Sequence, residues 1–342
     1  MPTERPPTID AVAAERWHDL LITPSPWLHE EVAGRMAQRL DWIKLQPAVW
    51  ADWGPVRGGL QAHGLVAKKY PDSECFVVEA LVHSAQSAID SIVKPWWNPA
   101  RWTGRATRFE PPPDAAVQML WANMALHMAP DPQALIATWH RALAVDGFLM
   151  FSCLGPDTLR ELRDLYQRLG WPPPSHQFTD MHDWGDMLVG AGFAEPVMDM
   201  ERITLSFATP QRLLGELRHL GRNLHPARFG GLRGRQWQRQ LHQELARHLQ
   251  VRGTGDVEGE GAGNGGGNSE GNGEGNGNGG GEGRRGDGSG NGPLTLTFEV
   301  IYGHALKPAP RLRARPEATM SLDDMRLALA QGRPGKGAHP AG

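Results

Sequence analysis

Short apolar runs alternate with amphipathic stretches through most of the chain. An apolar run of roughly four to eight residues between turn residues is typical of a buried strand. The predicted strands are 47–51, 75–78, 115–121 and 147–153, with a candidate edge strand at 107–109. The predicted helices between them are 60–69, 81–93 and 132–143. Strands that alternate with helices in this way indicate βαβ units and a parallel sheet.

Further helices lie at both ends of this pattern. Residues 12–45 are mostly helical, because Val32, Met36 and Leu40 recur on one helix face. The later predicted elements are helices 157–169 and 183–191, strand 197–207, helices 210–220 and 235–250, and strand 294–304. The last two strands break the alternation. We therefore expect a three-layer α/β domain with a helical insertion near its end.

A glycine tract interrupts the chain before the last strand. Residues 253–292 hold 20 of the chain's 42 glycines. Such a tract buries too little apolar surface to offset the entropy lost on ordering. We expect a low-complexity, disordered tract inside a domain that spans 12–308. Residues 1–11 are expected to be a disordered N-terminus, and 309–342 a tail.

Composition excludes several classes of protein. The net charge is −3, which argues against a nucleic-acid binder. The two cysteines, Cys75 and Cys153, each stand in an apolar run and predict buried, reduced thiols. The N-terminus lacks the apolar stretch of a signal peptide, and no run is long enough to cross a membrane. We expect a cytoplasmic protein without a membrane segment.

The first strand, its turn and the next helix contain candidate ligand-binding residues. Asp52, Gly54, Gly58 and Gly59 stand in that turn, and Glu79 ends the second predicted strand. In doubly wound folds the first βα turn approaches the ligand, and an acidic residue after the next strand can accept both ribose hydroxyls of a nucleoside. An ordinary turn followed by a surface glutamate is the alternative interpretation.

Several motifs resemble known families. The block Asp52-x-Gly54-x-Val56-x-Gly58, with Glu79, resembles the first motifs of class I S-adenosylmethionine-dependent methyltransferases. The stretch VQMLWANMALH, which includes Asn123, resembles their fourth-strand motif. More specific stretches are FLMFSCLGPDT, HQFTDMHDWGDMLVGAGFAEPVMDMERITLSF and LTFEVIYGHALKP. Together they resemble the malonyl-carrier-protein O-methyltransferases of biotin synthesis.

The resemblance implies a fold and a cofactor. The fold is a doubly wound, Rossmann-like, seven-stranded methyltransferase sheet with a helical insertion before the last strand. The cofactor is S-adenosylmethionine. The implied cofactor-binding residues are Asp52, Gly54, Gly58, Gly59, Glu79 and Asn123. A non-catalytic methyltransferase-like protein and a generic small-molecule methyltransferase remain the alternatives.

The implied reaction requires little acid–base chemistry from the protein. The acceptor is the free carboxylate of a malonyl thioester, which is already deprotonated at neutral pH. No general base is therefore expected, and His127 is the one weak candidate for a catalytic residue. His176, His182 and Asp183 match no metal-ligand spacing, so no metal is expected.

Val56 departs from the family pattern because it replaces the middle glycine of the motif. A branched side chain does not tolerate the backbone conformations open to glycine. One explanation is that the loop follows another path and Arg57 supplies positive charge. The other is that the cofactor is excluded and the fold is a binding scaffold. We favour the first.

The predicted insertion is strongly basic. Residues 212–252 contain nine arginines, no lysine and two acids. Because acyl carrier proteins are acidic, Arg233, Arg235 and Arg239 are candidates for binding a malonylated acyl carrier protein. A solvated helix surface is the main alternative, and nucleic-acid binding is the least favoured.

Overall fold

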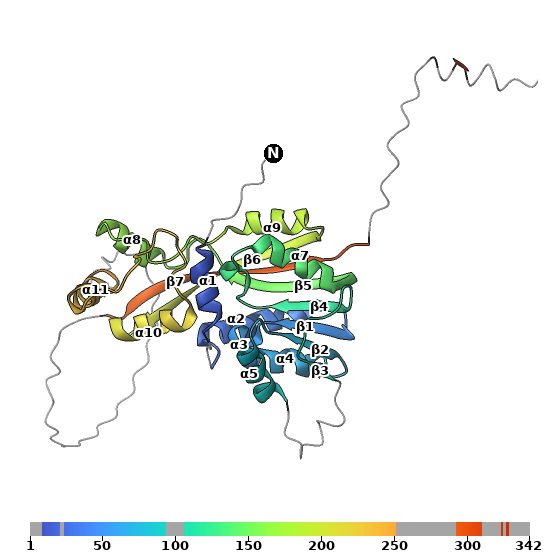
Figure 1. Cartoon of the computed structure of the whole chain (residues 1–342), viewed down its shortest axis with the longest axis horizontal. Helices are drawn as coiled ribbons and strands as arrows, with labels where there is room; N and C mark the ends of the chain where they lie inside the picture. The colour runs from blue at the N-terminus through green and yellow to red at the C-terminus, as the bar shows by residue number, and fades with distance from the viewer. Residues whose placement is uncertain are drawn as a thin grey trace, which may run out of the picture.

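The structure is a computed structural model, shown in Figure 1. It describes residues 9–20, 24–93, 106–250 and 292–309, together with 323, 326 and 327. The predicted glycine tract, apart from Gly292, lies outside these residues. So do residues 1–8 and most of the predicted tail.

Seven strands form one sheet in the order β3-β2-β1-β4-β5-β7-β6. The strands are β1 (Val49–Trp53), β2 (Glu74–Val78), β3 (Thr107–Arg108), β4 (Val117–Ala122), β5 (Leu143–Leu154), β6 (Ala194–Phe207) and β7 (Leu294–Leu306). Only β7 runs antiparallel to its neighbours β5 and β6. This order confirms the predicted doubly wound, Rossmann-like sheet, including the candidate edge strand.

Helices cover both faces of this sheet (Figure 1). They are α1 (Ala11–His18), α2 (Trp27–Arg39), α3 (Pro55–Gly58), α4 (Leu60–Lys69), α5 (Val82–Ile92), α7 (Pro132–Ala142), α8 (Arg160–Arg168), α9 (Met181–Gly190), α10 (Pro210–Leu220) and α11 (Arg235–His248). Two short 3-10 helices are η1 (Leu40–Trp42) and η2 (Leu126–Met128). The predicted helices are confirmed to within a few residues, except in the first βα turn, where α3 was not expected.

The side chains of each strand alternate between the two faces of the sheet, so the core consists of two clusters. Trp50 packs in one cluster with α2, α4 and α5, whereas its neighbour Ala51 packs in the other with α7 and α9. Successive strand residues point to opposite faces, so each buried strand serves both layers. This explains why the strands are continuously apolar. Cys75 and Cys153 are buried and unpaired, as predicted.

The helical insertion before β7 consists of α10 and α11, as expected. It packs against the N-terminal helix: the Asp10 N–H donates to the Leu224 carbonyl at 2.8 Å, and Arg228 Nη1 lies 2.6 Å from Asp10 Oδ2. Trp17 packs with Met128 in the same small apolar cluster as Leu224. The N-terminal helix and the insertion therefore form a joint cap at the carboxyl ends of the strands. Among the described residues, no helix is long and apolar enough to cross a membrane.

Candidate active site

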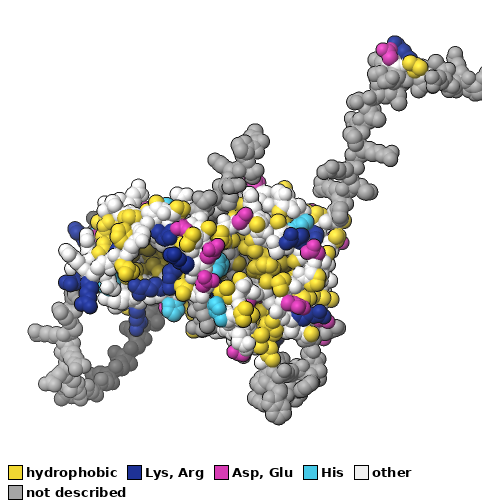
Figure 2. All heavy atoms as spheres, viewed as in Figure 1, with side chains coloured by type: hydrophobic (Ala, Val, Ile, Leu, Met, Phe, Trp, Pro, Cys, Tyr) yellow, Lys and Arg dark blue, Asp and Glu magenta, His cyan; other side chains and the backbone are white. Residues whose placement is uncertain are grey.

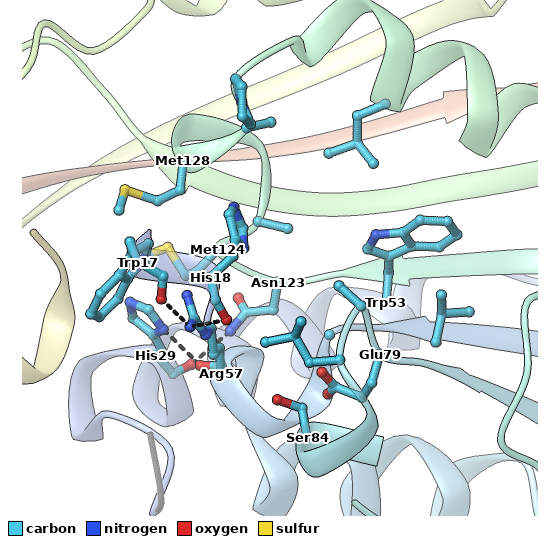
Figure 3. A pocket seen from close by; sticks show the side chains of 18 of the residues that line it. Trp17, His18, His29, Trp53, Arg57, Glu79, Ser84, Asn123, Met124 and Met128 are labelled. Carbon is cyan, nitrogen blue, oxygen red and sulfur yellow. Dashed lines mark hydrogen bonds between the residues drawn. The ribbon is translucent and has the colours of Figure 1, made fainter. Parts of the chain in front are cut away.

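A cavity of about 550 Å³ opens where β1, β2 and β4 end; we call it the first cavity. The cap and α7 provide its other walls (Figure 3). Its polar lining residues include His18, His29, Arg57, Glu79, Asn123 and Asp131, and most of the others are apolar. It lies at the point where doubly wound folds bind their ligands.

The altered glycine loop makes one short helix at the edge of this cavity. Gly54 has φ +75°, a left-handed conformation that favours glycine, and its N–H donates to the Val78 carbonyl at 2.8 Å. Val56 then lies inside α3, in right-handed helical conformation, with its side chain 1% exposed in the core. Valine is accommodated because the loop turns into a helix at this point. The structure therefore accommodates Val56, and cofactor binding by this loop stays a prediction.

Glu79 joins this loop to the end of β2. Its Oε1 accepts a hydrogen bond of 2.8 Å from the Val56 N–H. Burial raises the pKa of Glu79 to about 7, although the Val56 hydrogen bond and the charge of Arg57 both favour the carboxylate. The glutamate lines the first cavity (Figure 3), where an added hydroxyl donor would stabilise its charged form.

Asp52 does not line the first cavity. Its side chain is 2% exposed, and its Oδ2 lies 2.8 Å from Nδ1 of His63 on α4. Gly58 and Gly59 do not line the cavity either, and a Cβ at each would lie 2.9 Å from Asn123 O and Glu30 Oε2 respectively. Contact of these three residues with the cofactor stays a prediction. Gly58 and Gly59 allow close packing of the loop.

Asn123 lines the first cavity, but its side chain serves the fold. Its Nδ2 donates to the carbonyls of His29, at 2.9 Å, and Gly58. Its Oδ1 accepts from the Ser152 hydroxyl at 2.5 Å. Asn123 thereby ties the end of β4 to α2 and α3, and so fixes the floor of the cavity.

Arg57 fastens the cap over the first cavity. Its Nη2 donates to the backbone carbonyls of Trp17, His18 and Leu20, and its guanidinium carbon lies 4.5 Å from the centre of the Trp17 ring (Figure 3). Its Nη1 is buried and has no hydrogen-bond partner among the described residues. Arg57 therefore holds the cap against the loop beneath it.

A second cavity of about 240 Å³ adjoins the first, and Met128 and Leu220 line both. It lies between η2, the segments after β5 and α8, and the end of α10. Figure 2 shows a hollow with an apolar floor and basic side chains along its rim over the region of α8, α10 and α11. His127 lines this second cavity and not the first.

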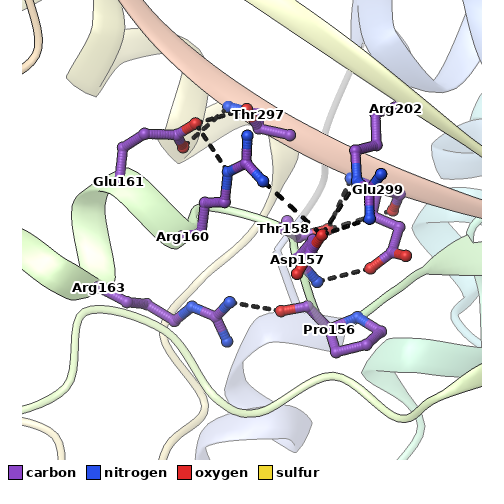
Figure 4. Close-up of polar contacts among 9 residues, drawn as sticks. All are labelled: Pro156, Asp157, Thr158, Arg160, Glu161, Arg163, Arg202, Thr297 and Glu299. Carbon is purple, nitrogen blue, oxygen red and sulfur yellow. Dashed lines mark hydrogen bonds and ion pairs between the residues drawn. The ribbon is translucent and has the colours of Figure 1, made fainter.

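Polar contacts hold the segment after β5 against β7 (Figure 4). Glu299 Oε2 accepts from the Asp157 N–H at 2.6 Å, and the Thr158 hydroxyl donates to the Glu299 carbonyl at 3.1 Å. Asp157 in turn lies 2.7 Å from Arg202 Nη2. This network fixes Thr158 and Leu159 in the wall of the second cavity.

The three arginines predicted as a carrier-binding surface line neither cavity. Arg235 and Arg239 are exposed on α11. The guanidinium carbon of Arg233 lies 4.4 and 4.0 Å from the ring centres of Phe229 and Trp237, so its charge stacks on two aromatic rings. No group of three or more candidate metal ligands occurs among the described residues.

The strand order and the cleft at the carboxyl ends of the strands define the class of protein as a Rossmann-like methyltransferase. Relatives of similar length then identify the family. A malonyl-[acyl-carrier protein] O-methyltransferase of Gallionella capsiferriformans is 35% identical over 297 residues, 83% of this chain and 86% of the relative. One from Laribacter hongkongensis is 33% identical, covering 87% of each chain. This chain belongs to the malonyl-[acyl-carrier protein] O-methyltransferase family.

Other comparisons add less. No known protein-family model matches the chain. The solved structure of the YcgJ protein from Bacillus is 13% identical with a TM-score of 0.47, covering 82% of this chain and 99% of that one. The fold assignment therefore rests on the strand order. The family names confirm the resemblance drawn from the sequence motifs, and they favour neither alternative function.

Proposed function

We propose that this protein transfers a methyl group from S-adenosylmethionine to the free carboxylate of a malonyl group on acyl carrier protein, a step in biotin synthesis. The observation that supports the proposal is the first cavity, which Gly54 and Glu79 line at the carboxyl ends of β1 and β2. The family's malonyl-[acyl-carrier protein] relatives supply the identity of the acceptor.

The first cavity fits the proposed cofactor. Glu79 uses one oxygen for the Val56 N–H, and its other oxygen accepts no hydrogen bond from a described residue, so it can receive ribose hydroxyls. The unpaired Nη1 of Arg57 suits the carboxylate of the methionine part. The bound cofactor supplies a sulfonium, which is an intrinsically good methyl donor.

The protein's own part is to orient the reactants and exclude water. The acceptor carboxylate is ionised at neutral pH, so no side chain need remove a proton. Trp17 and Arg57 close the cap over the first cavity. A water-excluding site that holds the acceptor in line with the donor methyl accounts for catalysis without a base.

The test is to incubate the full chain with malonyl-carrier protein and methyl-labelled S-adenosylmethionine. We expect a labelled methyl ester on the carrier. It should be detected as an increase in the mass of the carrier and, in a separate assay, as label released by mild alkali. Acetyl-carrier protein, which lacks the free carboxylate, should gain no label. Absence of label from the malonyl carrier would contradict the proposal.

We further propose that Arg235 and Arg239 on α11 attract the acidic carrier protein, with Arg233 beside them. Both exposed guanidinium groups can move toward a partner, whereas Arg233 is stacked on aromatic rings. Reversing both charges, by Arg235→Glu and Arg239→Glu, should weaken carrier binding and reduce its dependence on salt.

The matched control for this charge reversal is Lys68→Glu with Arg141→Glu. These residues are exposed on α4 and α7, and their reversal changes the net charge by the same amount. Equal carrier binding by the two double variants would show that α11 is an ordinary solvated surface.

A further inference from the structure

Three polar atoms of residues that line the second cavity have no partner within the described fold. His127 Nδ1, Ser175 Oγ and His176 Nδ1 are buried and have no hydrogen-bond partner among the described residues. The three side chains are 7%, 7% and 3% exposed, and all line this cavity. Buried polar groups without partners destabilise a fold. Three in one cavity therefore indicate a ligand that satisfies them.

The tautomer of His176 determines which hydrogen-bonding groups the ligand needs. His176 Nε2 lies 3.1 Å from the backbone carbonyl of His127, which can only accept, so Nε2 carries the proton. Burial lowers the pKa of His176 to about 4, and the ring is neutral at pH 7. Its Nδ1 is therefore a free acceptor, while the neighbouring Ser175 hydroxyl is a free donor. Together they match a group that carries both an N–H and a carbonyl.

Charge distinguishes this cavity from its neighbour. Arg218 and Arg222 line the second cavity, and no Asp or Glu is among its described lining residues. Within the described structure, the Arg222 guanidinium donates only to the backbone carbonyls of Arg218 and Gly221. It lies 5.1 Å from the centre of the Trp17 ring, on which Arg57 also stacks. Arg222 thus brings an uncompensated positive charge close to the first cavity, which Trp17 lines.

We propose that the second cavity binds the acyl end of the carrier's prosthetic arm, with Arg222 recognising the free carboxylate and Ser175 and His176 recognising thioester and amide groups of the arm. This assignment rests on the proposed function. It places the acceptor anion beside Trp17 and Met128, where the two cavities meet. Arg222 is then a residue that determines specificity for an acyl group ending in a carboxylate.

The test compares two ligands that differ in that carboxylate. Malonyl-pantetheine and acetoacetyl-pantetheine are titrated by calorimetry into the full chain, with and without S-adenosylhomocysteine. Because a hydrogen bond to a charged group is strong, the parent should prefer malonyl-pantetheine about tenfold or more. Arg222→Gln should abolish this preference.

The matched control is Arg212→Gln, at an exposed arginine of α10 that lines neither of the two cavities. It should keep the preference of the parent. An unchanged preference in Arg222→Gln, or no preference in the parent, would overturn the assignment of Arg222.

Ser175→Ala tests the buried cluster formed by His127, Ser175 and His176. Removing a buried hydroxyl that has no partner should leave the melting temperature unchanged or raise it. The substitution should also weaken the binding of both pantetheine ligands roughly threefold to tenfold, as expected for one lost hydrogen bond. Unchanged affinity for both ligands would overturn the role of the cluster.

These titrations are independent of the test of the proposed function, because they need no turnover. A parent that shows the malonyl preference but produces no methyl ester would contradict the proposed reaction and still support the anion site. A parent that produces the ester without any malonyl preference would contradict the anion site alone.

Discussion

The two adjoining cavities differ in how far their polar groups are already committed to the fold. In the first cavity, the side chains of Asn123 and Glu79 form hydrogen bonds with backbone groups of the loop and of α2. Arg57 donates hydrogen bonds to the cap, and its Nη1 has no partner among the described residues. In the second, three buried polar atoms have no described partner. Glu79, Asp131 and Arg57 line the first, whereas the charged lining residues of the second, within the described structure, are Arg218 and Arg222. This difference supports the two proposals, a cofactor site in the first cavity and an acceptor site in the second.

Val56→Gly should have the largest effect on the first cavity. Val56 is fully packed in the core, so removing its side chain leaves a void, and glycine also loosens α3. We expect a loss of about 3 kcal/mol in the free energy of unfolding, measured with denaturant. Restoring the family's glycine should therefore harm this protein.

The matched control is Val82→Gly in the first turn of α5, where the side chain is 88% exposed. It should cost no more than about 1 kcal/mol. If the two variants lose equal stability, Val56 is not a core residue of an altered loop.

Glu79→Gln should stabilise the protein at alkaline pH. The folded pKa is about 7 and the unfolded value about 4.5, so the folded state binds more protons between these values and stability falls as pH rises through them. A neutral glutamine avoids this loss and can still accept from the Val56 N–H. We expect a gain of about 2 kcal/mol at pH 8 and none at pH 4, read from denaturation curves at each pH. A gain independent of pH would contradict this account.

Arg57→Lys should loosen the cap. The lysine side chain is one bond shorter, so its ammonium does not reach the position of Nη2 among the carbonyls of Trp17, His18 and Leu20, and it lacks the planar group that stacks on the Trp17 ring. We expect a loss of about 1–2 kcal/mol of local stability. Amide hydrogen exchange in α1 should become roughly tenfold faster or more. The control is Arg16→Lys on the exposed side of the same helix, which should leave exchange unchanged. Equal exchange in both variants would mean that Arg57 does not hold the cap.

Deletion of residues 253–292, with a short Gly/Ser linker in their place, should have the smallest effect. Loop closure depends only logarithmically on length, so a shorter connection costs nothing. We expect the melting temperature to change by less than about 5 °C. A larger fall would mean that the tract packs against the domain.

The fold was largely predictable because burial on both faces makes each parallel strand a continuous apolar run. The short helix α3 was not, because Val56 looks like a defect in a motif until its packing is seen. The contact between Asp52 and His63 was not predictable either, because sequence spacing does not reveal this partner.

The second cavity could not be predicted from the sequence. Ser175 and His176 stand in an irregular loop without periodicity, and they meet His127 only through the tertiary fold. Likewise, Trp17 and Arg57 are 40 residues apart, and no spacing rule relates a cap to the loop beneath it. The basic composition of the insertion did point toward an anionic partner, but it did not single out Arg222.

The central claim is that the altered loop still forms a cofactor site. The most direct measurement is calorimetric titration of the full chain with S-adenosylhomocysteine, alongside Glu79→Ala and the exposed control Glu110→Ala. The account predicts micromolar affinity, about −8 kcal/mol, for the parent and the control, and a large loss for Glu79→Ala. No binding by the parent at millimolar concentration would contradict it.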